Sequence, residues 1–197
     1  MLKNFIIKNY YKRNLGNNKL NEKTLYDRLN EKNHVPLLIG HYIIIDNVHN
    51  STEPYPIVTI YGLGSCIALI IYDKENPLYG MSHILLPKLT RKSEIKYPHK
   101  YADLSVKNLV NDLISVGAQK ANLRAIMVGG SKIFDLKDNL IGDLNIESVK
   151  KELNSFDIKI EIEIVGGAEG RAILLDTNER AVYVKTTSEK EFNIHEI

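Results

Sequence analysis

One stretch decides how the middle of the chain folds: residues 62–86 read GLGSCIALIIYDKENPLYGMSHILL. Residues 67–72 form an apolar run of strand length, and residues 79–86 form a second, mostly apolar one. The polar segment between them, residues 73–77, ends in proline and is typical of a turn. The pattern therefore predicts a β-hairpin with two buried strands.

Two side chains suited to nucleophilic chemistry lie near the open end of this hairpin. Cys66 is the only cysteine in the chain and ends a glycine-rich turn, and His83 follows it by seventeen residues. If the strands pair through the turn, these residues lie roughly opposite one another, where Cβ atoms are about 4.5–5.5 Å apart. We expect a thiolate–imidazolium pair here, because the thiolate rather than the thiol is the nucleophile.

The turn before the cysteine contains Gly62, Gly64 and Ser65. Glycine reaches backbone conformations that are closed to other residues, so this turn could aim backbone N–H groups at a developing oxyanion. We therefore take Gly62, Gly64 and Ser65 as candidates for an oxyanion-binding turn. The same glycines do not fit a dinucleotide site, because they lead into a strand and not into a helix.

Simpler interpretations of the two residues stay open at this point. A free cysteine is often a small buried hydrophobe, and an isolated histidine in an apolar strand is usually packed and hydrogen-bonded. The other histidines show no spacing typical of metal ligation, so no metal site is predicted; they are His34, His41, His49, His99 and His195.

The pattern outside the hairpin is one of grouped strands with two helices between the later ones. Residues 158–164 alternate isoleucine with Lys or Glu, the period of two of a strand with one buried face. Grouped strands favour an α+β sandwich with mixed sheets and helices on one side. Further strands are predicted at 42–45, 57–61, 123–128, 172–175 and 181–186, and amphipathic helices at 102–116 and 146–156, the second one capped by Asn145.

Length and composition set the domain organisation. With 197 residues, of which 44% are hydrophobic, the chain can form one domain with a substantial core. We expect a poorly ordered basic extension at residues 1–34 and the domain at residues 35–197. A single cysteine forms no internal disulfide and no secretory signal pattern is present, so a cytoplasmic location is expected. Membrane insertion is not expected, because the apolar runs are far shorter than the roughly 20 residues of a span.

The charge is unevenly distributed along the chain. Residues 1–34 carry eight Lys or Arg against three Asp or Glu, and the remaining residues are net acidic. A basic arm can contact nucleic acid, but the chain shows no arginine–aromatic interleaving and no helix-turn-helix spacing. The acidic body would also repel phosphate, so nucleic-acid binding is not predicted.

Several motifs, in order along residues 40–187, resemble those of the chemoreceptor glutamine deamidase family, CheD. The resemblance begins at the cysteine turn and the histidine strand and continues well beyond them. The matching segments are residues 62–68, Tyr72-Asp73, residues 80–87, Tyr101-Ala102-Asp103, Gly117-Ala118, Leu123-x-Ala125, Gly129-Gly130-Ser131-x-Ile133-Phe134, Ile141-Gly142-x-x-Asn145 and Gly166-Gly167-x-x-Gly170-Arg171.

The resemblance implies a cysteine-dependent protein-glutamine glutaminase. Such an enzyme converts particular glutamines of methyl-accepting chemotaxis receptors to glutamate, with the family's nucleophile at Cys66 and its histidine at His83. The family fold is a layered α/β/β sandwich, and no cofactor is required. The implied partners are the cytoplasmic helices of chemoreceptors and a CheC-like phosphatase.

One position departs from the family pattern. The family usually has a threonine six residues before the cysteine as a third catalytic member, and here Ile60 holds that position. Thr59 lies one residue earlier and would point to the opposite face of the strand unless a bulge corrects it. The third role is therefore open among Thr59, Ser65 and no residue at all.

This departure leaves a second hypothesis beside the deamidase. The chain would then be a weakly catalytic or non-catalytic chemotaxis adaptor that docks to receptors or to a CheC-like phosphatase. A different cysteine hydrolase is a third option, for which the sequence offers no specific orienting Asn or Asp.

Overall fold

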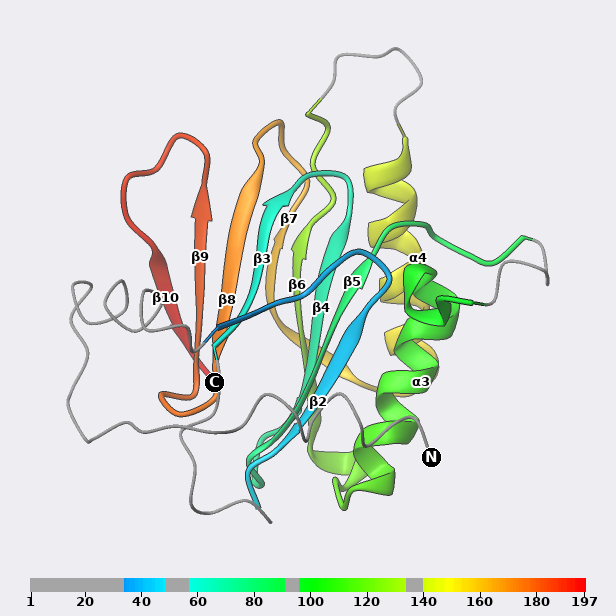
Figure 1. The fold of residues 1–197 in the computed structure, drawn as a ribbon. Coiled ribbons are helices and arrows are strands. Elements are labelled where there is room, and N and C mark those ends of the chain that lie inside the picture. Colours follow the sequence, from blue (N-terminus) through cyan, green and yellow to red (C-terminus); the bar gives the residue numbers. More distant parts are fainter. Residues whose placement is uncertain (1–33, 49–56, 91–95, 134–139) are drawn as a thin grey trace.

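The structure is a computed structural model that describes residues 34–48, 57–90, 96–133 and 140–197. Three layers are stacked in it: two helices, a five-stranded sheet against them, and a second five-stranded sheet on the far side (Figure 1). The predicted α/β/β sandwich with mixed sheets and two main helices is thereby confirmed. Of the expected extension at residues 1–34, all but His34 lies outside the described residues.

The sheet beside the helices, here called the central sheet, contains the predicted hairpin. Every residue of the two hairpin strands is buried, because the helices cover one face of this sheet and the second sheet covers the other. The order in the central sheet is β2 (Tyr42–Asp46), β5 (Leu78–Ile84), β4 (Ile67–Asp73), β6 (Leu123–Gly129) and β7 (Lys159–Val165).

The second sheet, here called the outer sheet, contains two strands that the sequence did not predict. Both are edge strands of three or four residues, which is too short to show a periodic pattern in the sequence. Pro36 is tolerated in the first of them because that strand lies at the edge of the sheet. The order in the outer sheet is β1 (His34–Pro36), β3 (Ile57–Leu63), β8 (Arg171–Asp176), β9 (Ala181–Thr186) and β10 (Asn193–Glu196).

The helices α3 (Ala102–Ser115) and α4 (Ile141–Ser155) lie on the central sheet and build one of two main cores with it. The other core lies between the two sheets. Short 3-10 turns, η2 (Pro98–Lys100) and η3 (Lys120–Asn122), lie on either side of α3. Within the described residues no helix is long and apolar enough to cross a membrane.

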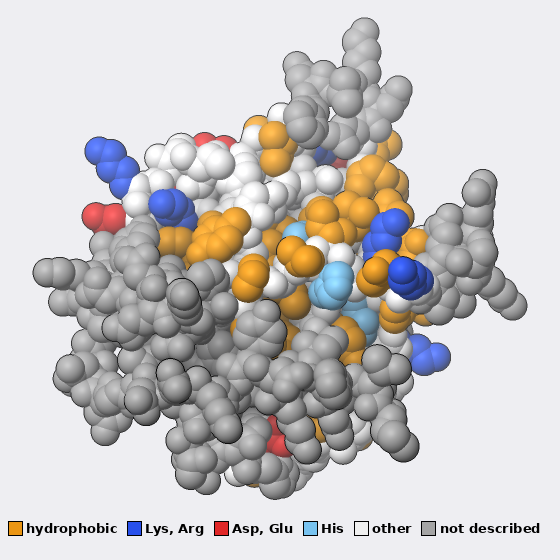
Figure 2. Space-filling model, viewed as in Figure 1, with side chains coloured by type: hydrophobic (Ala, Val, Ile, Leu, Met, Phe, Trp, Pro, Cys, Tyr) orange, Lys and Arg blue, Asp and Glu red, His pale blue; other side chains and the backbone are white. Residues whose placement is uncertain are grey.

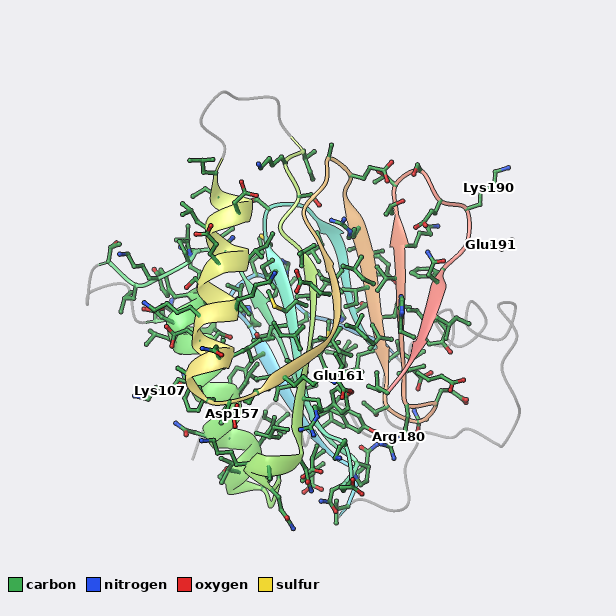
Figure 3. All side chains as sticks on the ribbon, turned by 180° about the vertical axis from the view of Figure 1, so that it is seen from behind. Lys107, Asp157, Glu161, Arg180, Lys190 and Glu191 are labelled. Atoms are coloured by element: carbon green, nitrogen blue, oxygen red, sulfur yellow. The ribbon has the colours of Figure 1, made fainter. Side chains whose placement is uncertain are left out.

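One local prediction is wrong in detail, and the strand predicted at 158–164 is confirmed with one irregularity. Helix α4 begins at Ile141 and not at residue 146, so Asn145 lies inside the helix and is not its cap. In β7 a register shift against β6 inserts Glu161 as an extra residue, so Ile160 packs toward the helices whereas Ile162 packs toward the outer sheet. Glu161, labelled in Figure 3, accepts a hydrogen bond from the Tyr72 hydroxyl at 2.5 Å.

Candidate active site

Cys66 lies one residue before β4, at the end of the core between the sheets, and retains 9% exposure. The turn that leads to it is fixed through its carbonyl groups. The Gly64 carbonyl accepts a hydrogen bond from Ser131 N (2.9 Å) and the Cys66 carbonyl accepts one from Gly130 N (2.8 Å). The carbonyl between them, that of Ser65, accepts one from the side chain of Asn145 (2.8 Å).

This arrangement also sets the direction of the N–H groups in the turn. The C=O and N–H of one trans peptide point in opposite directions, and no cis peptide occurs among the described residues. The N–H of Ser65 therefore points away from Ser131, and the N–H of Cys66 points away from Asn145. Both N–H groups are thus turned away from the segments that anchor the turn.

The glycines around the turn allow close backbone contacts. A Cβ on Gly129, whose φ is +118°, would lie 2.2 Å from the Cys66 carbonyl oxygen, and one on Gly64 would lie 2.5 Å from Ile133 Cδ1. Only glycine fits at position 129, because both the space and the positive φ exclude a side chain. Gly62 differs, since it lies exposed in a bulge of β3 with a φ of +68° and open space beside it.

His83 lies on β5 and faces the same core as Cys66. The pairing of β4 with β5 places His83 opposite Ala68, two residues beyond Cys66. Because side chains alternate along a strand, Cys66 and Ala68 share one face, and Cys66 is the diagonal neighbour of His83. Diagonal neighbours are about 7–8 Å apart and their Cβ atoms somewhat less, a separation within reach of an aromatic side chain such as histidine. The two residues are thus diagonal neighbours on one face of the central sheet, and not directly opposite as the sequence predicted.

The hydrogen bond of the His83 ring defines its tautomer. Nδ1 lies 3.0 Å from the carbonyl oxygen of Leu37, and a carbonyl only accepts, so Nδ1 is the donor. In the neutral ring the lone pair is then on Nε2. Nε2 is buried and has no hydrogen-bond partner among the described residues. The ring therefore presents a free basic nitrogen on the side away from Leu37.

The segment between β1 and β2 encloses His83. Its main-chain contacts are Gly40 N donating to the His83 carbonyl (2.8 Å) and His83 N donating to the His41 carbonyl (3.1 Å). The segment is tied in turn to the outer sheet, because Leu37 N donates to the Thr59 carbonyl at 2.8 Å. His83, only 6% exposed, is thus fixed on both its ring and its backbone.

The electrostatics favour neutral forms for both groups. Burial raises the pKa of the Cys66 thiol, and the backbone N–H of the same residue offsets this only in part. Burial lowers the pKa of His83, the Leu37 carbonyl opposes that change, and the nearby His41 lowers it further. Both shifts disfavour the thiolate–imidazolium ion pair expected from the sequence and favour a neutral thiol and a neutral imidazole.

Thr59 does not supply a third side chain. It is fully buried and pairs with Leu174, whose side chain lies in a separate cluster on the other face of the outer sheet, whereas Ile60 joins the core of Cys66. A bulge occurs in β3, but it lies between Ile60 and Leu63, after Thr59, and leaves Thr59 on that other face. The orienting partner of His83 is the Leu37 carbonyl, which a sequence cannot reveal.

Asn145 is the second group that sequence reasoning missed. It stands in a motif already noted for its resemblance, but asparagine before an amphipathic segment is also a common helix cap, which is how the sequence was interpreted. No group of three or more metal-ligating side chains occurs among the described residues.

Comparison with known proteins assigns the family. The family model described as CheD chemotactic sensory transduction matches residues 85–186. The "Probable chemoreceptor glutamine deamidase CheD" of Clostridium kluyveri is 38% identical over 146 residues, which cover 72% of this chain and 90% of that protein. The protein of the same name from Clostridium botulinum strain Eklund 17B is 41% identical over 138 residues, which cover 68% and 85%.

The longer alignments bear on the site itself. Because that alignment covers 72% of this chain, it includes both Cys66 and His83 wherever it begins. The identity and coverage hold for several relatives, including the one from the Hall strain of Clostridium botulinum, which is 37% identical over 72% of this chain and 90% of that protein. The chain belongs to the CheD family.

Proposed function

We propose that this protein is a deamidase that converts particular glutamines of methyl-accepting chemotaxis receptors to glutamate. The observation that carries the proposal is a buried His83 ring whose Nε2 is unprotonated and unpartnered among the described residues, one diagonal step from Cys66 across β4 and β5. The names of the relatives, chemoreceptor glutamine deamidases, supply the substrate class.

The first half of the reaction is acyl transfer to the cysteine. Nε2 of His83 takes the thiol proton as the sulfur of Cys66 adds to the carboxamide carbon of the glutamine. The tetrahedral intermediate collapses when the imidazolium returns this proton to the leaving nitrogen. Ammonia departs, and a thioester joins the glutamyl side chain to Cys66.

The second half regenerates the enzyme. The same Nε2 removes a proton from water, which attacks the thioester carbon, and the thiolate leaves and is reprotonated. The net reaction consumes one water and yields glutamate and ammonia, so no redox partner or cofactor is required. Holding the proton on Nδ1 through the Leu37 carbonyl keeps Nε2 available in both halves.

The oxyanion of both intermediates needs hydrogen-bond donors. The N–H groups of Ser65 and Cys66 are the best candidates, because their turn is rigidly anchored through its carbonyls. Gly64 contributes by allowing the turn to pack against Ile133, whereas Gly62 acts at a distance by shaping the bulge in β3.

The surface around the site supports a protein substrate. Figure 2 shows a face of the molecule on which apolar and histidine side chains gather. Leu38 (63% exposed) and Ile39 (48% exposed) belong to the segment that holds His83. Apolar side chains beside a site are suited to a helix of a receptor's cytoplasmic part. A cytoplasmic location and a CheC-like phosphatase partner remain parts of this proposal.

The adaptor hypothesis rested on the replaced threonine. The Leu37 carbonyl orients the His83 ring without any threonine side chain, so the replaced threonine does not by itself argue against catalysis. A chain selected only for docking would also have no need of a free Nε2 in a buried site, where an unpaired polar atom costs stability.

Replacing the nucleophile tests the proposal directly. Incubation with receptor fragments should raise the mass of specific glutamine peptides by about one dalton, and Cys66→Ala should lower this rate by about a thousandfold or more. His83→Gln should have a similar effect, whereas His195→Gln, on the edge strand β10, should keep the parent rate. Mass spectrometry of the fragments measures all four proteins. A mass shift that survives Cys66→Ala would contradict the proposed chemistry.

The neutral resting pair predicts a specific pH dependence. Because the pKa of Cys66 is raised, alkylation of the native thiol by iodoacetamide should keep rising above a pH of about 8.5, the usual thiol pKa. Because the pKa of His83 is lowered, the acid limb of kcat/KM should have its midpoint below about 6.5. An alkylation rate already high and level at mildly acidic pH would instead indicate a resting ion pair.

The orientation of Thr59 predicts that its hydroxyl is dispensable. Thr59→Val keeps the shape and leaves the Thr59 carbonyl in place to hold Leu37, so kcat and KM should stay within about twofold of the parent. The hydroxyl oxygen has no hydrogen-bond partner among the described residues, so stability should not fall. A large loss of kcat without unfolding would show that the hydroxyl does act in catalysis.

A further inference from the structure

A single buried amide joins the two halves of the site. The Nδ2 group of Asn145, a residue with 0% exposure, donates to the Ser65 carbonyl at 2.8 Å and to the Leu85 carbonyl at 3.0 Å. Ser65 immediately precedes the nucleophile, and Leu85 follows His83 by two residues. Both N–H bonds of the amide are therefore used, one on each side of the site.

The backbone itself does not hold these two segments together. The pairing of β4 with β5 ends at Ile67 and Ile84, and the N–H of Leu85 turns away to the Lys100 carbonyl. Beyond that last pair the cysteine turn and the end of β5 would be free to separate. Asn145 connects these two segments where the main-chain pairing of β4 with β5 no longer does.

The helix that carries the amide is fixed against the same turn. A Cβ on Gly142, one turn earlier in α4, would lie 2.4 Å from the Gly130 carbonyl oxygen, so the helix contacts that backbone directly. Gly130 in turn donates to the Cys66 carbonyl. Asn145 is thus presented from a rigid element whose position is already tied to the nucleophile.

We propose that Asn145 is a positioning residue that sets the distance and angle between the Cys66 thiol and Nε2 of His83. The inference rests on the proposed function, for which that geometry is needed. The other atom of its amide supports the idea, because Oδ1 is buried without a hydrogen-bond partner among the described residues. An unpaired buried oxygen costs stability, so the residue is poorly explained by stability alone.

The test compares Asn145→Ala with a matched control on the same helix. Ser148 donates through Oγ to the Pro87 carbonyl (2.6 Å), so Ser148→Ala also removes a bond from α4 to the chain after β5, but none to the cysteine turn. Each variant is characterised by its Tm, by kcat and KM on receptor fragments, and by the rate at which 4-nitrophenyl acetate acylates Cys66. Acylation of the only thiol needs no receptor and releases 4-nitrophenolate, which is read by absorbance.

The expected result is a selective loss of the chemical step. Asn145→Ala should lower kcat and the acylation rate about tenfold or more with KM within about twofold, because a misplaced base slows proton transfer without affecting docking. Ser148→Ala should lower Tm by an amount comparable to Asn145→Ala. Its kcat and its acylation rate should nevertheless stay at the level of the parent. Unchanged rates in Asn145→Ala, or equal losses in the two variants, would overturn the proposal.

A second variant keeps the test decisive if Asn145→Ala does not fold. Asn145→Asp has the same shape, and its carboxyl donates only when protonated, so its acylation rate relative to the parent should fall as pH rises. If Asn145→Asp acylates as fast as the parent at every pH, the proposal is overturned. If the parent deamidates no receptor fragment, the proposed function fails, while the acylation rates still decide the role of Asn145.

Discussion

The hydrogen bond from Nδ1 of His83 to the Leu37 carbonyl, 3.0 Å long, is the interaction on which the rest of the site depends. It fixes the tautomer, and the tautomer leaves the lone pair on Nε2, the atom that serves as the base in the proposed reaction. The carbonyl is held in turn by the outer sheet, because Leu37 N donates to Thr59. A histidine of the central sheet is thereby oriented through a segment tied to the other sheet, so the proposed chemistry depends on how the two sheets pack.

Burial shifts the pKa values of Cys66 and His83 in the directions that favour their neutral forms. The thiol and the imidazole lie at the end of the core between the sheets, where desolvation raises the pKa of Cys66 and lowers the pKa of His83. In the proposed reaction, proton transfer from the thiol to Nε2 accompanies attack on the substrate amide. The cysteine turn must then be rigid, and it is held by backbone bonds from Gly130 and Ser131 and by the amide of Asn145.

The sequence was sufficient to predict the hairpin, because two long apolar runs around a polar turn fit few other structures. The hairpin alone makes Cys66 and His83 neighbours on one face of the central sheet. It could not predict the role of Leu37, since any residue has a carbonyl and its position depends on contacts distant in the chain. Asn145 was misinterpreted because a capping asparagine and a bridging one have the same local sequence context. The sequence also could not indicate in which direction the pKa values of Cys66 and His83 shift, because those shifts depend on burial, which local pattern does not fix.

Nitrogen-15 NMR of the His83 ring in the native protein at neutral pH tests the central claim most directly. The account predicts a neutral imidazole with its proton on Nδ1 and a bare Nε2, since Nδ1 donates to the Leu37 carbonyl. A proton on Nε2, or a doubly protonated ring beside a thiolate, would contradict it.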